Sequence, residues 1–169
     1  MADKNYGPGK KATYTYEEVR EYAVAAMKDR AKTLGAFYQV MPRELFHEYA
    51  TKAMFAYGAA KGDRIPTKNS PKAFSEFLVS CNSVANTCAD KNSLISCTDD
   101  EAVVRFDGVC ALVEGWQEMG ITADEVKYLC EVQSYGDYGH TDSVGCKGEF
   151  LCNSATPGCD HCEFKITKK

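Results

Sequence analysis

The sequence predicts an α+β fold: N-terminal helices followed by a ββ-αα-ββ order, with an antiparallel sheet of about four strands backed by helices. Two observations predict it. Residues 15–88 carry apolar side chains at steps of three and four, which is the helical period. Residues 93–108 and 148–168 hold short β-rich runs separated by polar turns, as hairpins do. Helices and strands that are grouped in this way indicate α+β rather than alternating α/β architecture.

The chain length indicates one domain. The chain has 169 residues, 44% of them hydrophobic, which is enough for a core without additional cross-links. Residues 1–14 are polar, with "GPGKK" at their centre, and are expected to form a flexible N-terminal arm. Residues 15–169 are expected to form the single domain.

Composition excludes several classes of function. The 20 basic and 24 acidic residues give a net charge of −4 without a basic patch, so no nucleic-acid partner is expected. No run approaches the ~18–20 apolar residues that a membrane span needs, and the N-terminus lacks the apolar core of a secretory signal. A cytoplasmic location is therefore expected. Thiols stay reduced there, so the nine cysteines indicate packing, metal binding or catalysis rather than a disulfide framework.

Two helices are predicted first. Thr15 followed by Glu18 forms a capping box that begins the first helix, and Gly35 is a natural stop. The second helix covers residues 41–62, with Pro42 in its first turn. Its apolar side chains recur at helical spacing.

A third helix and a hairpin follow. The third helix covers residues 72–88 and places Cys81 and Cys88 on its apolar face, as small core residues. Residues 93–108 read as two strands flanking the turn "TDDE", with Cys97 at the end of the first strand.

The remainder is predicted as two helices and two strands. A short helix within residues 109–120 is followed by a helix from residue 122 to 136, which opens with a second capping box, Thr122 and Glu125. Residues 137–148 are polar and contain glycines, which predicts a loop. The last two strands, 148–154 and 161–168, enclose a turn.

The C-x-x-C pair near the C-terminus invites a metal or redox interpretation. Cys162 alternates with outward-facing residues in "HCEFKI" and therefore points towards the core, whereas Cys159 lies in the preceding turn. No second close pair completes a zinc site. A redox pair of the thioredoxin kind sits at a helix N-terminus, but this pair leads into a strand. We interpret it as one inward thiol beside a turn residue.

A nucleophilic site is the other chemical hypothesis. Cys110 lies at the start of a helix, where backbone N–H groups would stabilise a thiolate. The predicted loop brings Asp137 and His140 together, and a histidine oriented by a carboxylate can act as general base. Thiol, histidine and aspartate are the parts of nucleophilic hydrolysis. The alternative is a solvated surface loop.

The chain resembles the L-2-amino-thiazoline-4-carboxylic acid hydrolase family. The resemblance rests on "FYQVMPRELFHEYATKAMFAYGAAKG", on "VVRFDGVCALVEGWQEMGITADEVKYLCEVQSYGDYG" and on "CDHCEFKI", and it spans roughly residues 16–167. Ala111 departs from the family pattern, which commonly has proline there. The positions that match the family pattern are Cys110, Cys130, Asp137 and Cys162.

The resemblance implies a hydrolase that opens the C–N ring of a small cyclic amidine or thiazoline and gives a carbamoyl-cysteine. Cys110, Asp137 and His140 are then the expected catalytic residues. Cys130 and Cys162 are candidate ligands of a divalent metal such as zinc, which would activate water in place of a thiol nucleophile. The expected partner is a small-molecule substrate, and no membrane contact is expected. The sequence leaves open whether the protein forms a homo-oligomer. The alternative function is a non-catalytic module that binds a small molecule or a metal.

Overall fold

The computed structural model describes residues 13–65, 67–80 and 91–169. The elements are α1 (Tyr16–Val40), α2 (Arg43–Ala59), the 3-10 turn η1 (Gly62–Arg64), α3 (Pro71–Ser80), β1 (Lys91–Cys97), β2 (Glu101–Asp107), α4 (Ala111–Glu118), α5 (Ala123–Ser143), β3 (Cys146–Cys152) and β4 (Cys162–Lys168). This order confirms the predicted α+β class. Most of the predicted N-terminal arm (1–12) and the predicted core cysteines Cys81 and Cys88 lie outside the described residues.

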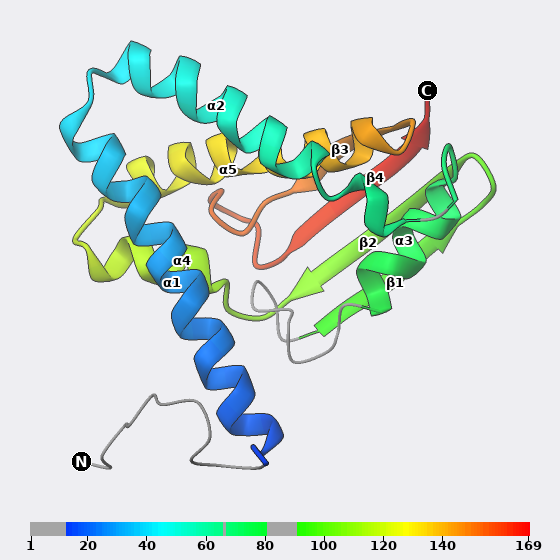
Figure 1. Cartoon of the computed structure of the whole chain (residues 1–169), viewed down its shortest axis with the longest axis horizontal. Coiled ribbons are helices and arrows are strands. Elements are labelled where there is room, and N and C mark those ends of the chain that lie inside the picture. Colours follow the sequence, from blue (N-terminus) through cyan, green and yellow to red (C-terminus); the bar gives the residue numbers. More distant parts are fainter. Residues whose placement is uncertain (1–12, 66, 81–90) are drawn as a thin grey trace.

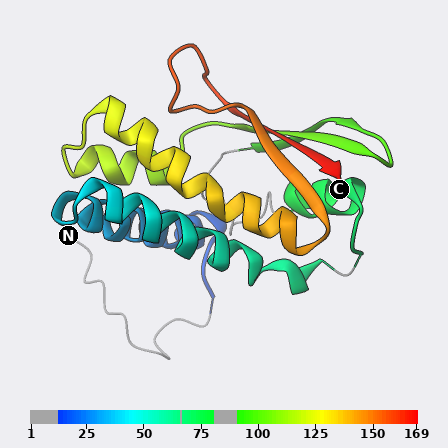
Figure 2. The same ribbon diagram turned by 90° about the horizontal axis from the view of Figure 1, so that it is seen from above.

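The strands form one antiparallel sheet in the order β1-β2-β4-β3. Helix α3 packs against β1, β2 and β4, and α5 packs against β3. On its other side α5 packs closely against α2, so that the sheet, α5 and α2 form successive layers (Figure 2). Helix α1 packs mainly against α4, away from the sheet (Figure 1). The helical half and the sheet half therefore meet along α5.

Each half has its own hydrophobic core. The helical core surrounds Trp116, which is fully buried and donates a hydrogen bond from its Nε1 to the carbonyl oxygen of Ala31 at 2.7 Å. The second core lies between α3 and the sheet and includes Phe74, Phe164 and Ile166. Phe164 and Ile166 are buried on alternate positions of β4, as the sequence alternation predicted.

Helix α1 begins where predicted but ends later. The Thr15 hydroxyl accepts from the backbone N–H of Glu18, and the Glu18 carboxylate accepts from the backbone N–H of Thr15. The predicted stop at Gly35 is wrong. A Cβ at Gly35 would lie 2.8 Å from the Met119 sulfur, so glycine allows α4 to approach here. The helix ends at Val40 because the residue before Pro42 is disfavoured in helical conformation.

The predicted loop at residues 137–148 is also wrong, because α5 continues to Ser143 and β3 begins at Cys146. The glycines that suggested a loop lie where α5 meets α2. A Cβ at Gly139 would lie 2.0 Å from the carbonyl oxygen of Phe55, and a Cβ at Gly58 would lie 1.7 Å from that of Gly136. These glycines allow two helix backbones to touch. Asp137 and His140 therefore project from a helix and not from a loop.

Candidate functional site

A cleft lies between α1 and α2. The two helices meet at Met41 and Pro42 and then diverge, because α1 packs on α4 and α2 on α5 (Figure 1). The cleft has a volume of about 460 Å³. Its lining is almost entirely apolar in area and comprises Arg30, Thr33, Leu34, Phe37, Met41, Phe46, Tyr49, Ala50, Ala53, Met54 and Gln133.

The walls of this cleft expose large apolar side chains. Phe37 on α1 and Tyr49 on α2 keep more than half of their surface accessible, at 55% and 57%. Of the phenylalanine and tyrosine side chains of α2, only Phe46 is buried. A cluster of exposed apolar side chains of this kind is typical of a ligand or partner site.

The end of the cleft farthest from the Met41–Pro42 turn carries two cations. The Arg30 guanidinium lies 4.5 Å from the centre of the Tyr57 ring, and its Nη1 donates to the tyrosine hydroxyl at 3.3 Å. The Lys61 ammonium lies 4.2 Å from the centre of the same ring. A tyrosine face attracts cations through its quadrupole, so the ring holds both side chains at this end.

Asp137 on α5 is the neighbouring anion. Surrounding protein atoms raise its pKa to about 6 by desolvation, while the charges of Lys61 and Arg30 oppose the shift. Its side chain nevertheless has solvent-accessible surface. Because water still reaches this carboxylate, only part of the desolvation cost applies to it.

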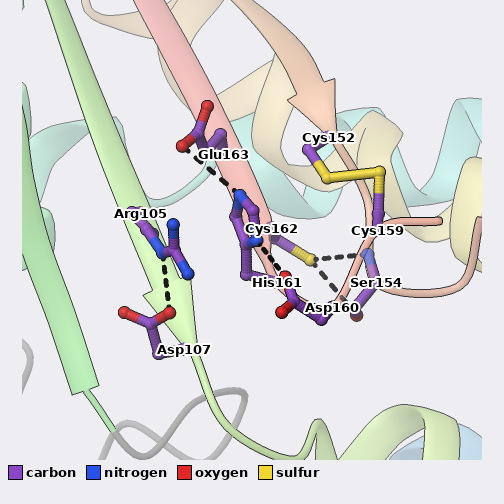
Figure 3. Close-up of polar contacts among 9 residues, drawn as sticks. All are labelled: Arg105, Asp107, Cys152, Ser154, Cys159, Asp160, His161, Cys162 and Glu163. Atoms are coloured by element: carbon purple, nitrogen blue, oxygen red, sulfur yellow. Dashed lines mark hydrogen bonds and ion pairs between the residues drawn. A yellow bond between two sulfur atoms is a disulfide. The ribbon is translucent and has the colours of Figure 1, made fainter.

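The three thiols of the family pattern come together at a second place. Cys162 accepts a hydrogen bond from the backbone N–H of Ser154 at 3.3 Å and donates to the Ser154 hydroxyl at 3.4 Å (Figure 3). Burial raises the pKa of Cys130 to about 12, with smaller contributions from Cys110, Cys162 and Asp137. Burial also raises the pKa of Cys162. That these positions form one functional pocket stays a prediction.

Two thiols of this cluster, Cys130 and Cys162, are neutral at physiological pH. Raised pKa values keep Cys130 and Cys162 protonated at neutral pH, and a thiol is a much weaker nucleophile and ligand than a thiolate. Among the residues that the structure describes, no group of three or more His, Cys, Asp or Glu side chains is arranged to hold a metal ion. The zinc ligands Cys130 and Cys162 stay a prediction.

His140 lies apart from the thiol cluster. Its ring packs edge-on against Phe74 at 4.8 Å and Phe77 at 5.8 Å, on the side of α3. Burial lowers its pKa to about 4, helped by the charges of Lys61 and Arg64. Cys110 instead packs on the helical core with Cys130. The charge of Asp137 thus acts on Cys130 and Cys162, whereas His140 lies beside the other core.

The two cysteines of the C-x-x-C motif have different partners. Cys159 forms a disulfide with Cys152, not with Cys162 (Figure 3). Cys159 lies in the turn before β4, as predicted, but the expectation that the cysteines stay reduced is wrong for Cys152 and Cys159. His161 contacts Asp160 at 2.5 Å and Glu163 at 3.3 Å, so it helps to hold the segment before β4. The disulfide and these contacts fix the β3–β4 loop that supplies Ser154.

Comparison with known proteins shows the fold but no family. No family model matches the chain, and no curated protein matches its sequence. Among solved structures, the chain is similar to a trafficking protein particle complex subunit 3 from Naegleria fowleri, described as covalently bound to palmitic acid. The TM-score is 0.59 at 12% identity, over 86% of this chain and 96% of that chain. At this identity the likeness concerns the fold alone.

Within the described part of the chain, none of the helices has the length and apolarity needed to cross a bilayer.

Proposed function

We propose that the protein binds the acyl chain of a small amphiphile in the cleft between α1 and α2. The observation that carries this proposal is the cleft itself. Its volume of about 460 Å³ falls within the ~300–1,000 Å³ of typical small-molecule sites, which are mostly apolar with a few polar groups. The lining here is mostly apolar, and its one charged side chain is Arg30.

The structural neighbour supports this chemistry, because it is described as covalently bound to palmitic acid. A thioester link to an acyl chain would need a cysteine in the cleft. None of the residues that line the cleft is a cysteine, and the sequence contains no cysteine before Cys81. We therefore propose that the ligand is held without a covalent bond.

The acyl chain alone gives modest affinity. Each buried methylene group contributes about 0.8 kcal/mol, so ten of them contribute roughly 8 kcal/mol. Association costs about 4 kcal/mol or more in lost motion. The remainder corresponds to a Kd near ~1 mM, so contacts to the polar end of the ligand would decide whether binding is tight.

The proposal is tested by filling part of the cleft with a larger side chain. Ala53 is exposed on α2 and lines the cleft, whereas Ala56 is exposed on the same helix and does not line it. In calorimetric titrations with dodecanoic acid, Ala53→Trp is expected to weaken binding by ~10-fold or more, because the indole occupies part of the cavity. Ala56→Trp is the matched control and is expected to bind as wild type does. Equal binding by both variants, or no binding by the wild type, contradicts the proposal.

The cyclic-amidine hydrolase implied by the sequence resemblance is a second proposal. The convergence of Cys110, Cys130 and Cys162 favours it, and Asp137 is the candidate base that acts on this cluster. Turnover of L-2-amino-thiazoline-4-carboxylate by wild type, lost in Cys110→Ser with the fold intact by circular dichroism, would support it. Full activity in Cys110→Ser would remove the thiol from the mechanism, and an inactive wild type would remove the activity.

A further inference from the structure

The two cations at the end of the cleft farthest from the Met41–Pro42 turn suggest the chemistry of the ligand's polar end. Arg30 is on α1, Tyr57 is on α2, and Lys61 follows the end of α2. The ring of Tyr57 therefore gathers positive charge from both walls of the cleft at one place. Since Arg30 also lines the apolar cavity, this charge lies where an acyl chain in the cleft would end.

These two cations differ from Lys28 and Lys32, the lysines on either side of Arg30 on α1. Lys28 contacts the Glu114 and Glu118 carboxylates at 3.0 and 2.8 Å, and Lys32 contacts Glu118 at 2.7 Å. In the part of the chain that the structure describes, neither Arg30 nor Lys61 has a salt bridge. An aromatic ring thus takes the place that an acidic partner takes elsewhere on the helix.

We propose that Arg30 and Lys61 bind the anionic head group, a carboxylate or a phosphate ester, of the amphiphile whose chain occupies the cleft. This inference rests on the proposed function and adds the class of head group. A guanidinium matches the two oxygens of a carboxylate or phosphate with parallel N–H donors, and the lysine adds a second charge. An alcohol or a neutral ester offers no charge for these groups to pair with.

Asp137 contributes a negative charge near Arg30 and Lys61. Its carboxylate interacts with both Lys61 and Arg30, so it partly neutralises them in the free protein. A bound anion would add a second negative charge beside it. Removing this carboxylate in Asp137→Asn is therefore expected to strengthen binding of an anionic ligand and to leave binding of a neutral one unchanged.

The experiment compares three ligands of equal chain length on the full chain: dodecanoic acid, dodecan-1-ol and dodecyl phosphate. Hydrogen bonds to charged groups are strong enough for the acid to bind ~10-fold or more tightly than the alcohol. In Lys61→Gln, whose residue does not line the cleft, this preference is expected to shrink while the affinity for the alcohol stays constant. In Arg30→Gln the affinity for the acid is expected to fall more than the affinity for the alcohol. Lys147→Gln, which removes an exposed lysine on β3, is the control and keeps the preference. The stronger of the two anions identifies the head group as carboxylate or phosphate.

Three outcomes show whether this inference, the role of Arg30 or the proposed function itself fails. Equal affinity for acid and alcohol in the wild type would overturn the head-group assignment and leave the acyl cleft standing. An equal loss for both ligands in Arg30→Gln would show that this residue only shapes the cleft. Absence of binding by all three ligands would overturn the cleft function together with the inference.

Discussion

Replacing Gly139 with alanine is predicted to disrupt the contact between α2 and α5. A Cβ at this position would lie 2.0 Å from the carbonyl oxygen of Phe55 and 2.8 Å from its carbonyl carbon. The obstacle is helix backbone, which cannot move aside by rotating a side chain. The two helices must separate, and overpacking of this kind costs about 1–3 kcal/mol or more. Because α5 also packs against β3, the separation weakens the junction between the two cores.

Gly136 provides the matched control on the same helix. A Cβ there would meet the nearest atoms, from Gln133 and Met54, at 3.5 Å, which is an ordinary contact distance. Alanine also favours a helix over glycine by about 1 kcal/mol. Urea denaturation followed by circular dichroism should therefore show a loss of about 2–3 kcal/mol in Gly139→Ala and little loss or a gain in Gly136→Ala. Equal stability of the two variants would refute the account of this interface.

Three further predictions concern stability. The raised pKa of Asp137 means that the folded state favours its protonated form, so the contribution of this group to stability falls as pH rises from about 4 to about 6, whereas His140, with its pKa lowered to about 4, contributes in the opposite direction; the melting temperature of wild type relative to that of Asp137→Asn should therefore fall over this range. Trp116→Phe loses the hydrogen bond to Ala31 and should lower the free energy of unfolding by about 1–3 kcal/mol in urea. Non-reducing peptide mapping should find Cys152 joined to Cys159, and reduction should lower stability by about 2 kcal/mol.

The elements that sequence reasoning placed correctly are those with local physical signals. The capping boxes at Thr15 and Thr122 mark helix starts because their hydrogen bonds involve residues only three apart. The alternation around Phe164 marks the last strand, because burial of one sheet face has a period of two. Such signals need no knowledge of the remainder of the chain.

The errors arise where a residue serves a distant partner. Gly35 and Gly139 look like helix breakers in sequence, but their role is to admit Met119 and the backbone of Phe55. Nothing near them in the chain reveals that approach. The same holds for Cys159, whose partner Cys152 is seven residues away across a loop.

The cleft was missed for a related reason. An apolar stripe on a helix usually packs against the protein core, so helical spacing alone gives no sign of a cavity. In the structure Tyr49 and Ala53 line an open cavity instead, because α1 and α2 pack on different helices. The available signal was the breadth of the apolar surface on α2, which extends beyond the part that contacts α5.

Site-resolved methyl NMR tests the central claim, acyl-chain binding between α1 and α2, most directly. On titration with dodecanoic acid, the methyl signals of Ala50, Ala53 and Met54 are expected to shift together in a saturable way, because these residues line the cleft. Those of Ala102 and Ala111, buried elsewhere, should stay in place. Shifts confined to the second pair, or no saturable shift at any of the five, would contradict the account.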